Sequence, residues 1–315
     1  MQGKIQRAQG CLLGQLAGDA LGSLVEFLSP EMIRKKYPNG VRKLEDGGTW
    51  DTIAGQPTDD SEMALLLARY LVKTGTYNAK EMQNAYLFWL NSQPFDCGMT
   101  IASALLGRKN PNSQANGALM RISPLGIFGA NYPLATVANW AIQDAQLTHS
   151  NPVCLQANAL MAMAIAEAVN QNIDAKTLFV KIKHWAQTLT VDDLLLQAIE
   201  ESEIAPPKDY ITQQGWVIIA FHNMLWQLQH AESLESGVID TVMRGGDTDT
   251  NAAICGALLG AVYGIKAIPE QWLTAILNCR PSIDLPSIKR PRPKCFWPAD
   301  ALELAEQLVN PSSKN

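Results

Sequence analysis

The spacing of apolar residues constrains the fold most strongly, because it repeats every three to four residues along nearly the whole chain. This spacing places apolar side chains on one face of a helix and so predicts helices. Strand-like alternation is missing; the best strand candidate is 215–221, "GWVIIAF", and the residues after it continue in helical register. The predicted helices cover residues 5–24, 61–73, 79–91, 98–107, 117–129, 133–145, 151–170, 175–188, 192–201, 216–229, 234–242, 251–264, 269–278 and 299–309.

The segments between these helices are rich in glycine and proline, as in "DGGTW" and "RPSIDLPSIKRPRPK". A length of 315 residues allows one large domain or two of ordinary size. No break in composition and no long polar linker divides the chain, and 47% of its residues are hydrophobic, enough for a sizeable core. We therefore predict an all-α fold in a single domain that spans residues 1–315.

Charge and cysteine usage exclude several classes of protein. The net charge is −5 and no basic tract occurs, which argues against a general nucleic-acid-binding protein. The 6 cysteines are scattered without a Cys-x-x-Cys pair, as expected for reduced thiols. The N-terminal apolar stretch is too short for a signal peptide and contains Gln15 and Asp19, and no run of 18 apolar residues occurs. We expect a cytoplasmic monomer that contacts no membrane.

Two of the predicted helices carry glycines at four-residue spacing: Gly14, Gly18 and Gly22 in the first, and Gly256, Gly260 and Gly264 in the later one. Each glycine inside a helix costs up to about 1 kcal/mol relative to alanine, so a packing reason is required. We expect the two helices to cross closely through these faces. Such a crossing would bring Asp19 and Glu26 near the segment "RGGDTDTN".

Acidic residues cluster at two predicted helix starts, in "PTDD" at 57–60 and in "GGDTDT" at 245–250. Helix capping is one interpretation, with Asp59 as N-cap and Glu62 three residues later as in a capping box. However, one cap needs one acid, and each segment supplies two acids and a threonine hydroxyl. Two carboxylates about 4 Å apart repel by roughly 4 kcal/mol at an effective dielectric constant near 20, so a compensating group is required.

Divalent cations would provide this compensation if the two segments meet in space. Carboxylate and hydroxyl oxygens are hard ligands that suit Mg²⁺ or Mn²⁺ better than Zn²⁺. Four carboxylates would neutralise two such cations, and Gly245 and Gly246 would give the backbone the freedom to reach the site. The candidate ligands are Thr58, Asp59, Asp60, Asp247, Asp249 and Thr250.

These clusters also belong to a wider set of motifs. In order, the motifs are "GCLLGQLAGDALGSLVEF", "PTDDSEMA", "PFDCGMT", "NGALMRISPLG", "LTHSNP" and "RGGDTDTNAAICGALLGAVYG". The set resembles the ADP-ribosylglycohydrolase family, which includes the dinitrogenase reductase-activating glycohydrolases. The resemblance covers roughly residues 8 to 264, and the tail "RPKCFWPADALELAEQLV" is similar to bacterial members. It implies an all-α fold, a two-metal centre, and hydrolysis of an N- or O-glycosidic bond to ADP-ribose.

The resemblance also implies roles for individual residues. The six oxygen-bearing residues of the two acidic segments fall on the family's metal-ligand positions. Glu26 falls on an acidic position that faces metals and substrate, and Asp96 of "PFDCG" matches an acid proposed as catalytic base. The positions implied in ADP-ribose binding are Asn116, Gly117 and Met120 of "NGALMR" and His149 of "LTH". We expect Arg121 to form a structural ion pair rather than to bind the diphosphate.

The implied reaction is a metal-dependent attack at C1 of the distal ribose, with an ADP-ribosylated arginine of a protein as the substrate. Several alternatives stay open. The acceptor can instead be serine, a small molecule or a nucleic acid. A two-metal phosphoesterase would cleave the diphosphate and release AMP, and a catalytically silent relative would only bind ADP-ribose. The complete set of candidate ligands argues against the silent relative.

Overall fold

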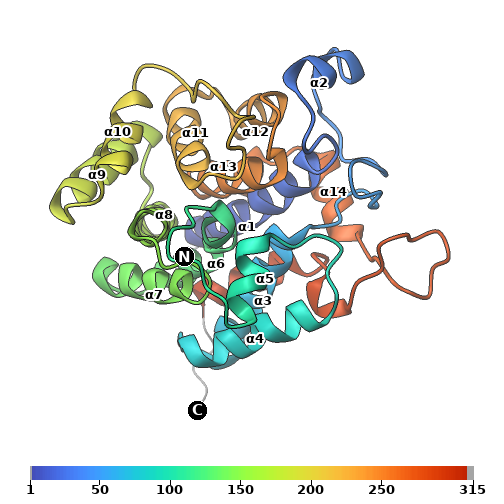
Figure 1. Ribbon diagram of the computed structural model, residues 1–315, viewed down its shortest axis with the longest axis horizontal. Coiled ribbons are helices and arrows are strands. Elements are labelled where there is room, and N and C mark those ends of the chain that lie inside the picture. The colour runs from blue at the N-terminus through green and yellow to red at the C-terminus, as the bar shows by residue number, and fades with distance from the viewer. Residues whose placement is uncertain (1, 311–315) are drawn as a thin grey trace.

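The computed structural model describes residues 2–310, which form helices joined by loops (Figure 1). The α-helices are α1 (Gln2–Gly22), α2 (Pro30–Lys36), α3 (Asp59–Thr74), α4 (Ala79–Asn91), α5 (Met99–Leu105), α6 (Ser123–Gly129), α7 (Leu134–Gln146), α8 (Pro152–Asn170), α9 (Ala175–Thr188), α10 (Asp193–Glu201), α11 (Val217–His230), α12 (Leu234–Met243), α13 (Thr248–Tyr263), α14 (Glu270–Asn278) and α15 (Ala301–Val309). Short 3₁₀ helices are η1 (Asn116–Arg121), η2 (Ile265–Ala267) and η3 (Lys294–Phe296).

The all-α prediction is confirmed, since residues 2–310 contain only two isolated bridges, Gly47–Thr52 and Ala115–Trp216, and no strand. The predicted helix over 117–129 is wrong in one respect, because the structure divides it into η1 and α6. Pro124 occupies the first turn of α6 and has no N–H to donate, so an unbroken α-helix through this point would lose a hydrogen bond. The short helix α2 was not predicted.

Helices α1 and α13 cross near the middle of the molecule (Figure 1). A side-chain carbon at Gly14 would lie 2.1 Å from the Gly256 carbonyl oxygen, and one at Gly18 would lie 2.0 Å from that of Ala252. Such distances exclude any side chain, so the predicted crossing is confirmed and explains these glycines. Gly264 differs from the others, because it ends α13 with a φ of +75°.

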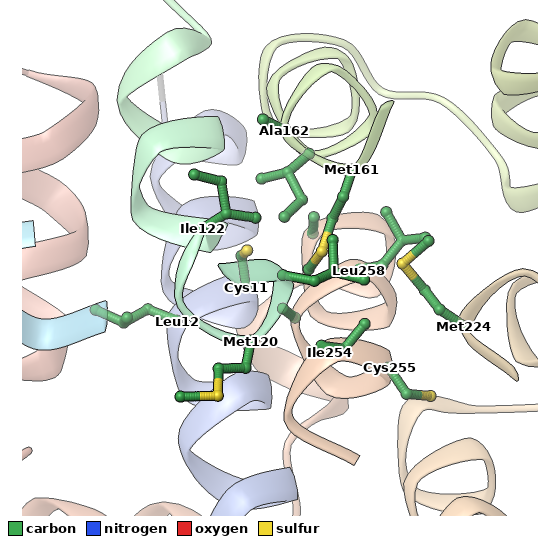
Figure 2. Packing of buried hydrophobic residues seen from close by; sticks show 14 of the residues in the cluster. Cys11, Leu12, Met120, Ile122, Met161, Ala162, Met224, Ile254, Cys255 and Leu258 are labelled. Carbon is green, nitrogen blue, oxygen red and sulfur yellow. The ribbon is translucent and has the colours of Figure 1, made fainter. Parts of the chain in front are cut away.

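The core forms where α8, α11 and the η1–α6 segment pack around this crossing. Figure 2 shows Met120 of η1, Met161 of α8 and Met224 of α11 around the two crossing helices, which contribute Leu12 and Leu258. Helix α8 is long and apolar enough to cross a membrane, but 78% of its apolar window is buried inside the fold. It is therefore one of the core helices of this protein.

Candidate metal and substrate site

Nearly all candidate site residues lie around one cavity of about 340 Å³. The cavity is bounded by the turn after α1, the first turns of α3 and α13, the segment before α5, and η1. The predicted residues that line it are Glu26, Asp59, Asp96, Asn116, Gly117, Met120, His149, Asp247, Asp249 and Thr250. Thr58 and Asp60 are buried in the wall behind this lining. The structure thus brings together every site residue that the sequence suggested.

Two glycines allow the turn after α1 to meet the start of α13. Gly245 and Gly246 have φ values of +76° and +77°, and a side-chain carbon at Gly246 would lie 2.0 Å from the Tyr210 carbonyl oxygen. The Phe27 N–H donates to the Gly246 oxygen at 2.8 Å, and the Gly246 N–H donates to the Leu28 oxygen at 3.1 Å. The two glycines therefore fit only as glycines, as the sequence suggested.

This pairing of loops sets the position of Glu26. The helix α1 ends at Gly22, two residues before the end predicted from the sequence. Glu26 therefore lies in the turn that follows the helix. A carboxylate oxygen of Glu26 lies within 4.8 Å of carboxylate oxygens of Asp247 and Asp249. These three acids form a group that can hold a metal ion.

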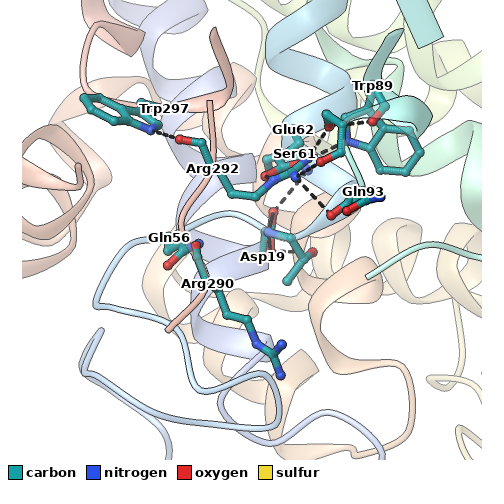
Figure 3. A network of polar contacts seen from close by, with 11 residues as sticks. Asp19, Gln56, Ser61, Glu62, Trp89, Gln93, Arg290, Arg292 and Trp297 are labelled. Atoms are coloured by element: carbon teal, nitrogen blue, oxygen red, sulfur yellow. Dashed lines mark hydrogen bonds and ion pairs between the residues drawn. The ribbon is translucent and has the colours of Figure 1, made fainter. Parts of the chain in front are cut away.

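Asp19 of α1 performs the capping that we considered for the acids of α3. Its carboxylate accepts hydrogen bonds from the backbone N–H of Thr58 at 3.1 Å and of Ser61 at 3.1 Å. The capping-box interpretation of Asp59 and Glu62 is wrong, because Thr58 is the N-cap and Glu62 binds Arg292 instead (Figure 3). Asp59 is therefore not required for capping, and this strengthens the case for another role.

The two acidic segments meet at Asp60. The Thr250 hydroxyl donates to Asp60 Oδ2 at 3.3 Å, and the Thr58 hydroxyl donates to the same oxygen at 3.2 Å. The other oxygen, Oδ1, is buried without a hydrogen-bond partner among residues 2–310. A buried carboxylate oxygen without a partner is costly, and it fits the hard oxygen ligand that a divalent cation requires.

The electrostatics of the cluster follow from burial and mutual repulsion. Burial raises the pKa of Asp59, Asp60 and Asp249 well above the usual range, and the neighbouring carboxylates raise it further. The same causes raise the pKa of Glu26 to about 8, with Asp96 and Asp247 as the nearby charges.

Two arginines are buried in the described part of the chain, and both pair elsewhere. Arg121 binds Asp144 at 3.0 Å, which confirms the structural ion pair expected for it, and Arg292 binds Glu62 at 2.7 Å. The site therefore combines several carboxylates, two hydroxyls and an orphaned oxygen with no cationic side chain bound to them among residues 2–310. This donor set is composed of hard oxygens and fits Mg²⁺ or Mn²⁺.

The opposite wall of the cavity carries the residues implied in ADP-ribose binding. Asn116 Nδ2 donates to Asp247 Oδ2 at 2.7 Å and so connects η1 to the acidic cluster. A side-chain carbon at Gly117 would lie 2.8 Å from Ile101 Cδ1, so a larger residue there would require the Ile101 side chain to move. Met120 and His149 complete this wall.

Two contacts of the site were not predicted from the sequence. The Trp50 indole N–H donates to Glu26 Oε2 at 2.6 Å, and the Gly98 N–H donates to Asp59 Oδ2 at 3.2 Å. The partners are 24 and 39 residues apart, and Glu26, Trp50 and Gly98 lie outside the helices, where no periodicity indicates which residues meet. Only the proline- and glycine-rich composition of these segments marked them as loops.

Comparison with known proteins shows the family of the chain. A family model described as ADP-ribosylglycohydrolase matches residues 1–313. The chain is 29% identical to the ADP-ribosyl-dinitrogen reductase glycohydrolase of Rhodospirillum rubrum, over 86% of this chain and 90% of that protein. It is 26% identical to the ADP-ribosylarginine hydrolase Tri1 of Pseudomonas putida (strain GB-1), over 86% of this chain and 74% of that protein.

A solved structure gives the same result for the fold. The structure titled "ADP-ribosylglycohydrolase-related protein complex" superimposes with a TM-score of 0.80 and 26% sequence identity, covering 99% of this chain and 100% of that chain. Because the family model covers nearly the whole sequence and the fold agrees, the chain belongs to the ADP-ribosylglycohydrolase family.

Proposed function

We propose that the protein hydrolyses the glycosidic bond between ADP-ribose and an arginine side chain of a modified protein, with two divalent cations, Mg²⁺ or Mn²⁺, as cofactors. Family membership supports the reaction class. The names of the Rhodospirillum and Pseudomonas relatives support a protein substrate and an arginine acceptor. The carboxylates that meet around one cavity without a cationic partner are the observation that carries the proposal.

The ligands that we propose for the cations are the six residues of the two acidic segments: Thr58, Asp59, Asp60, Asp247, Asp249 and Thr250. The position of Glu26 beside Asp247 and Asp249 supports it as a further ligand or as a close neighbour of the cations. Bound divalent cations would orient the ribose hydroxyls and water and polarise the bond to be cleaved.

The chain itself supplies the groups that move protons. Asp96 lies in the segment before α5, lines the cavity and is not one of the proposed metal ligands. Its carboxylate is therefore available to accept a proton from an attacking water. Glu26 is held by the Trp50 indole and lies beside the acids of α13. We therefore assign the general base to Asp96 and assign Glu26 to positioning the substrate and closing the site.

Product analysis tests this proposal. The purified protein is incubated with ADP-ribosyl-arginine and ADP-ribosyl-serine peptides, with and without EDTA, and the products are separated by chromatography. We expect ADP-ribose to be released from the arginine peptide in the presence of Mg²⁺ or Mn²⁺ and not in EDTA. Release from serine alone would change the acceptor, release of AMP would indicate a phosphoesterase, and binding without turnover would indicate a silent relative.

A further inference from the structure

A chain of buried polar contacts leads from Asp144 through Arg121 and Thr148 to His149, which lines the cavity. All four residues have 0% of their surface exposed. The metal-binding proposal does not use Asp144, Arg121 or Thr148. Their arrangement determines where the proton of the His149 ring is held.

The Arg121 side chain is held in place by several contacts, and its guanidinium can donate hydrogen bonds but not accept them. Its Nε and Nη2 donate to Asp144 Oδ2 and to the Asp144 carbonyl oxygen, both at 3.0 Å, and its Nη1 donates to the Gly117 oxygen at 3.1 Å. The guanidinium lies 4.5 Å from the centre of the Tyr86 ring. Hydroxyls of Tyr77 and Tyr86 donate to Asp144 and hold the carboxylate in turn.

The Thr148 hydroxyl connects Arg121 to the His149 ring. Its Oγ1 accepts a hydrogen bond from Arg121 Nη1 at 3.0 Å and lies 2.8 Å from His149 Nδ1. The hydroxyl proton must also find an acceptor, since leaving it buried and unpaired would cost about 1–3 kcal/mol. Within residues 2–310 the structure gives it none other than His149 Nδ1. The hydroxyl therefore donates to Nδ1, and the ring proton is on Nε2.

The other nitrogen of the His149 ring has no protein partner among residues 2–310, and the ring lines the cavity. Nε2 is buried and has no hydrogen-bond partner in the described part of the chain. Burial, with the charges of Arg121 and Lys109, lowers the pKa of His149 to about 3, so the ring is neutral near pH 7. The ring carbon Cε1 lies 3.5 Å from the place where a side-chain carbon of Gly117 would be, beside the η1 wall of the cavity.

We propose that Thr148 and Arg121 are positioning residues that hold His149 in the Nε2–H tautomer, so that Nε2–H donates a hydrogen bond to an oxygen of the ADP-ribose part of the substrate. The identity of the ligand rests on the proposed function. The tautomer does not, because it follows from the contacts of the free protein.

Imidazole NMR combined with binding measurements tests the inference. Full-length protein with ¹⁵N-labelled histidine gives ring nitrogen shifts that distinguish the tautomers, and a His149→Gln variant assigns the signal among the 4 histidines. The Kd for ADP-ribose is measured by calorimetry on the same samples. We expect the Nε2–H tautomer in the unmodified protein. In Thr148→Val, where Nδ1 loses its donor, we expect a shift towards Nδ1–H and a Kd about 5- to 30-fold weaker.

Two further variants separate this role from a merely structural one. Thr148→Ser keeps the hydroxyl and should restore both the tautomer and the Kd. Thr241→Val removes another fully buried threonine hydroxyl, which binds Gly237 and Asn223 away from the cavity, and should change neither.

Each outcome decides one of the two claims. An Nδ1–H tautomer in the unmodified protein contradicts the inference even if Thr148→Val does not fold. Unchanged tautomer and Kd in a folded Thr148→Val variant contradict it as well. An Nε2–H tautomer in a protein that does not bind ADP-ribose contradicts the ligand that we assign to His149 and, with it, the proposed function.

Discussion

Asp60 and Glu62 lie two residues apart in the first turn of α3, and each is 1% exposed, yet their surroundings differ. Glu62 accepts hydrogen bonds from Arg292 at 2.7 and 2.8 Å and from the Trp89 indole at 2.8 Å. Asp60 accepts only from threonine hydroxyls and keeps one oxygen without a partner among residues 2–310. Glu62 is compensated by a cation of the chain, and Asp60 is not.

The same contrast recurs between helices. Asp144 is buried against Arg121 and two tyrosine hydroxyls, whereas Asp249 has the carboxylates of Glu26 and Asp60 as its charged neighbours. The partner of a compensated acid offsets part of the cost of burial, so removing either member of the pair leaves an unpaired buried charge and destabilises the fold. The acids proposed as metal ligands have no such partner within residues 2–310 and lie in or next to one cavity, which favours a binding role for them.

Removing the compensated carboxylate should have the largest effect on stability. Glu62→Gln leaves the buried Arg292 charge unpaired, so we expect the free energy of unfolding to fall by about 3–5 kcal/mol in chemical denaturation. Glu303→Gln, on the exposed face of α15, is the matched control and should stay within about 0.5 kcal/mol of the unmodified protein. Equal stability of the two variants would show that the Glu62–Arg292 pair is not required.

Separating α1 from α13 should disrupt the site and leave the Glu62–Arg292 pair in place. Leucine at Gly18 would clash with the backbone of Ala252, so we expect Gly18→Leu to lower the free energy of unfolding by about 3 kcal/mol. Gly3→Leu on the same helix meets only the flexible end of the Arg7 side chain and serves as the control. Unchanged thermal unfolding of Gly18→Leu would contradict the close crossing.

Among the uncompensated acids, substitution of the proposed base should affect turnover alone, and substitution of Glu26 should also affect binding. We expect Asp96→Asn to lower kcat at least about 10²-fold, the scale of general-base catalysis, while metal and ADP-ribose affinities stay nearly unchanged. Glu26→Gln should weaken metal or substrate binding as well as the rate, because Glu26 lies beside Asp247 and Asp249. Turnover assays and titration calorimetry compare the two. If Asp96→Asn turns over normally and Glu26→Gln is inactive with intact affinities, Glu26 is the general base and Asp96 is not.

The smallest expected effect concerns stability without metal. Asp60→Asn removes one of several mutually repelling buried charges, so in EDTA we expect the free energy of unfolding to stay equal or to rise by about 1 kcal/mol. The same variant should lose most activity when metal is supplied. A loss of stability as large as that of Glu62→Gln would mean that Asp60 is a structural acid, and the contrast between the two would then fail.

The sequence predicted those features that depend on local spacing. The glycines at 14 and 18 and at 256 and 260 predicted the crossing, since only close backbone contact explains them in helices. The acidic segments predicted the composition of the site. The seven-residue α2 was missed because Ile33 is its single buried residue, too few for an amphipathic pattern.

Pairings between distant residues could not be predicted. Arg292 and Glu62 are 230 residues apart, and Asp19 binds the N-cap residue Thr58, which lies 39 residues later. Charge and hydrogen-bonding capacity are visible in the sequence, but the fold decides which acid finds a partner. The spacing of Asp59 and Glu62 indicated a capping box made by neighbouring residues. In the structure Asp19 caps the helix and Arg292 binds Glu62 instead.

Metal binding by the isolated protein tests the central claim most directly. Metal-free protein is titrated with Mg²⁺ and with Mn²⁺ by calorimetry, bound ions per chain are counted by elemental analysis, and Asp249→Asn and Glu303→Gln are measured beside it. We predict two bound ions per chain in the unmodified protein and in Glu303→Gln, and the loss of at least one in Asp249→Asn. At a free metal concentration of 100 times Kd, each bound ion should stabilise the fold by about 2.7 kcal/mol. No binding at millimolar metal, together with full hydrolysis in EDTA, would contradict the account.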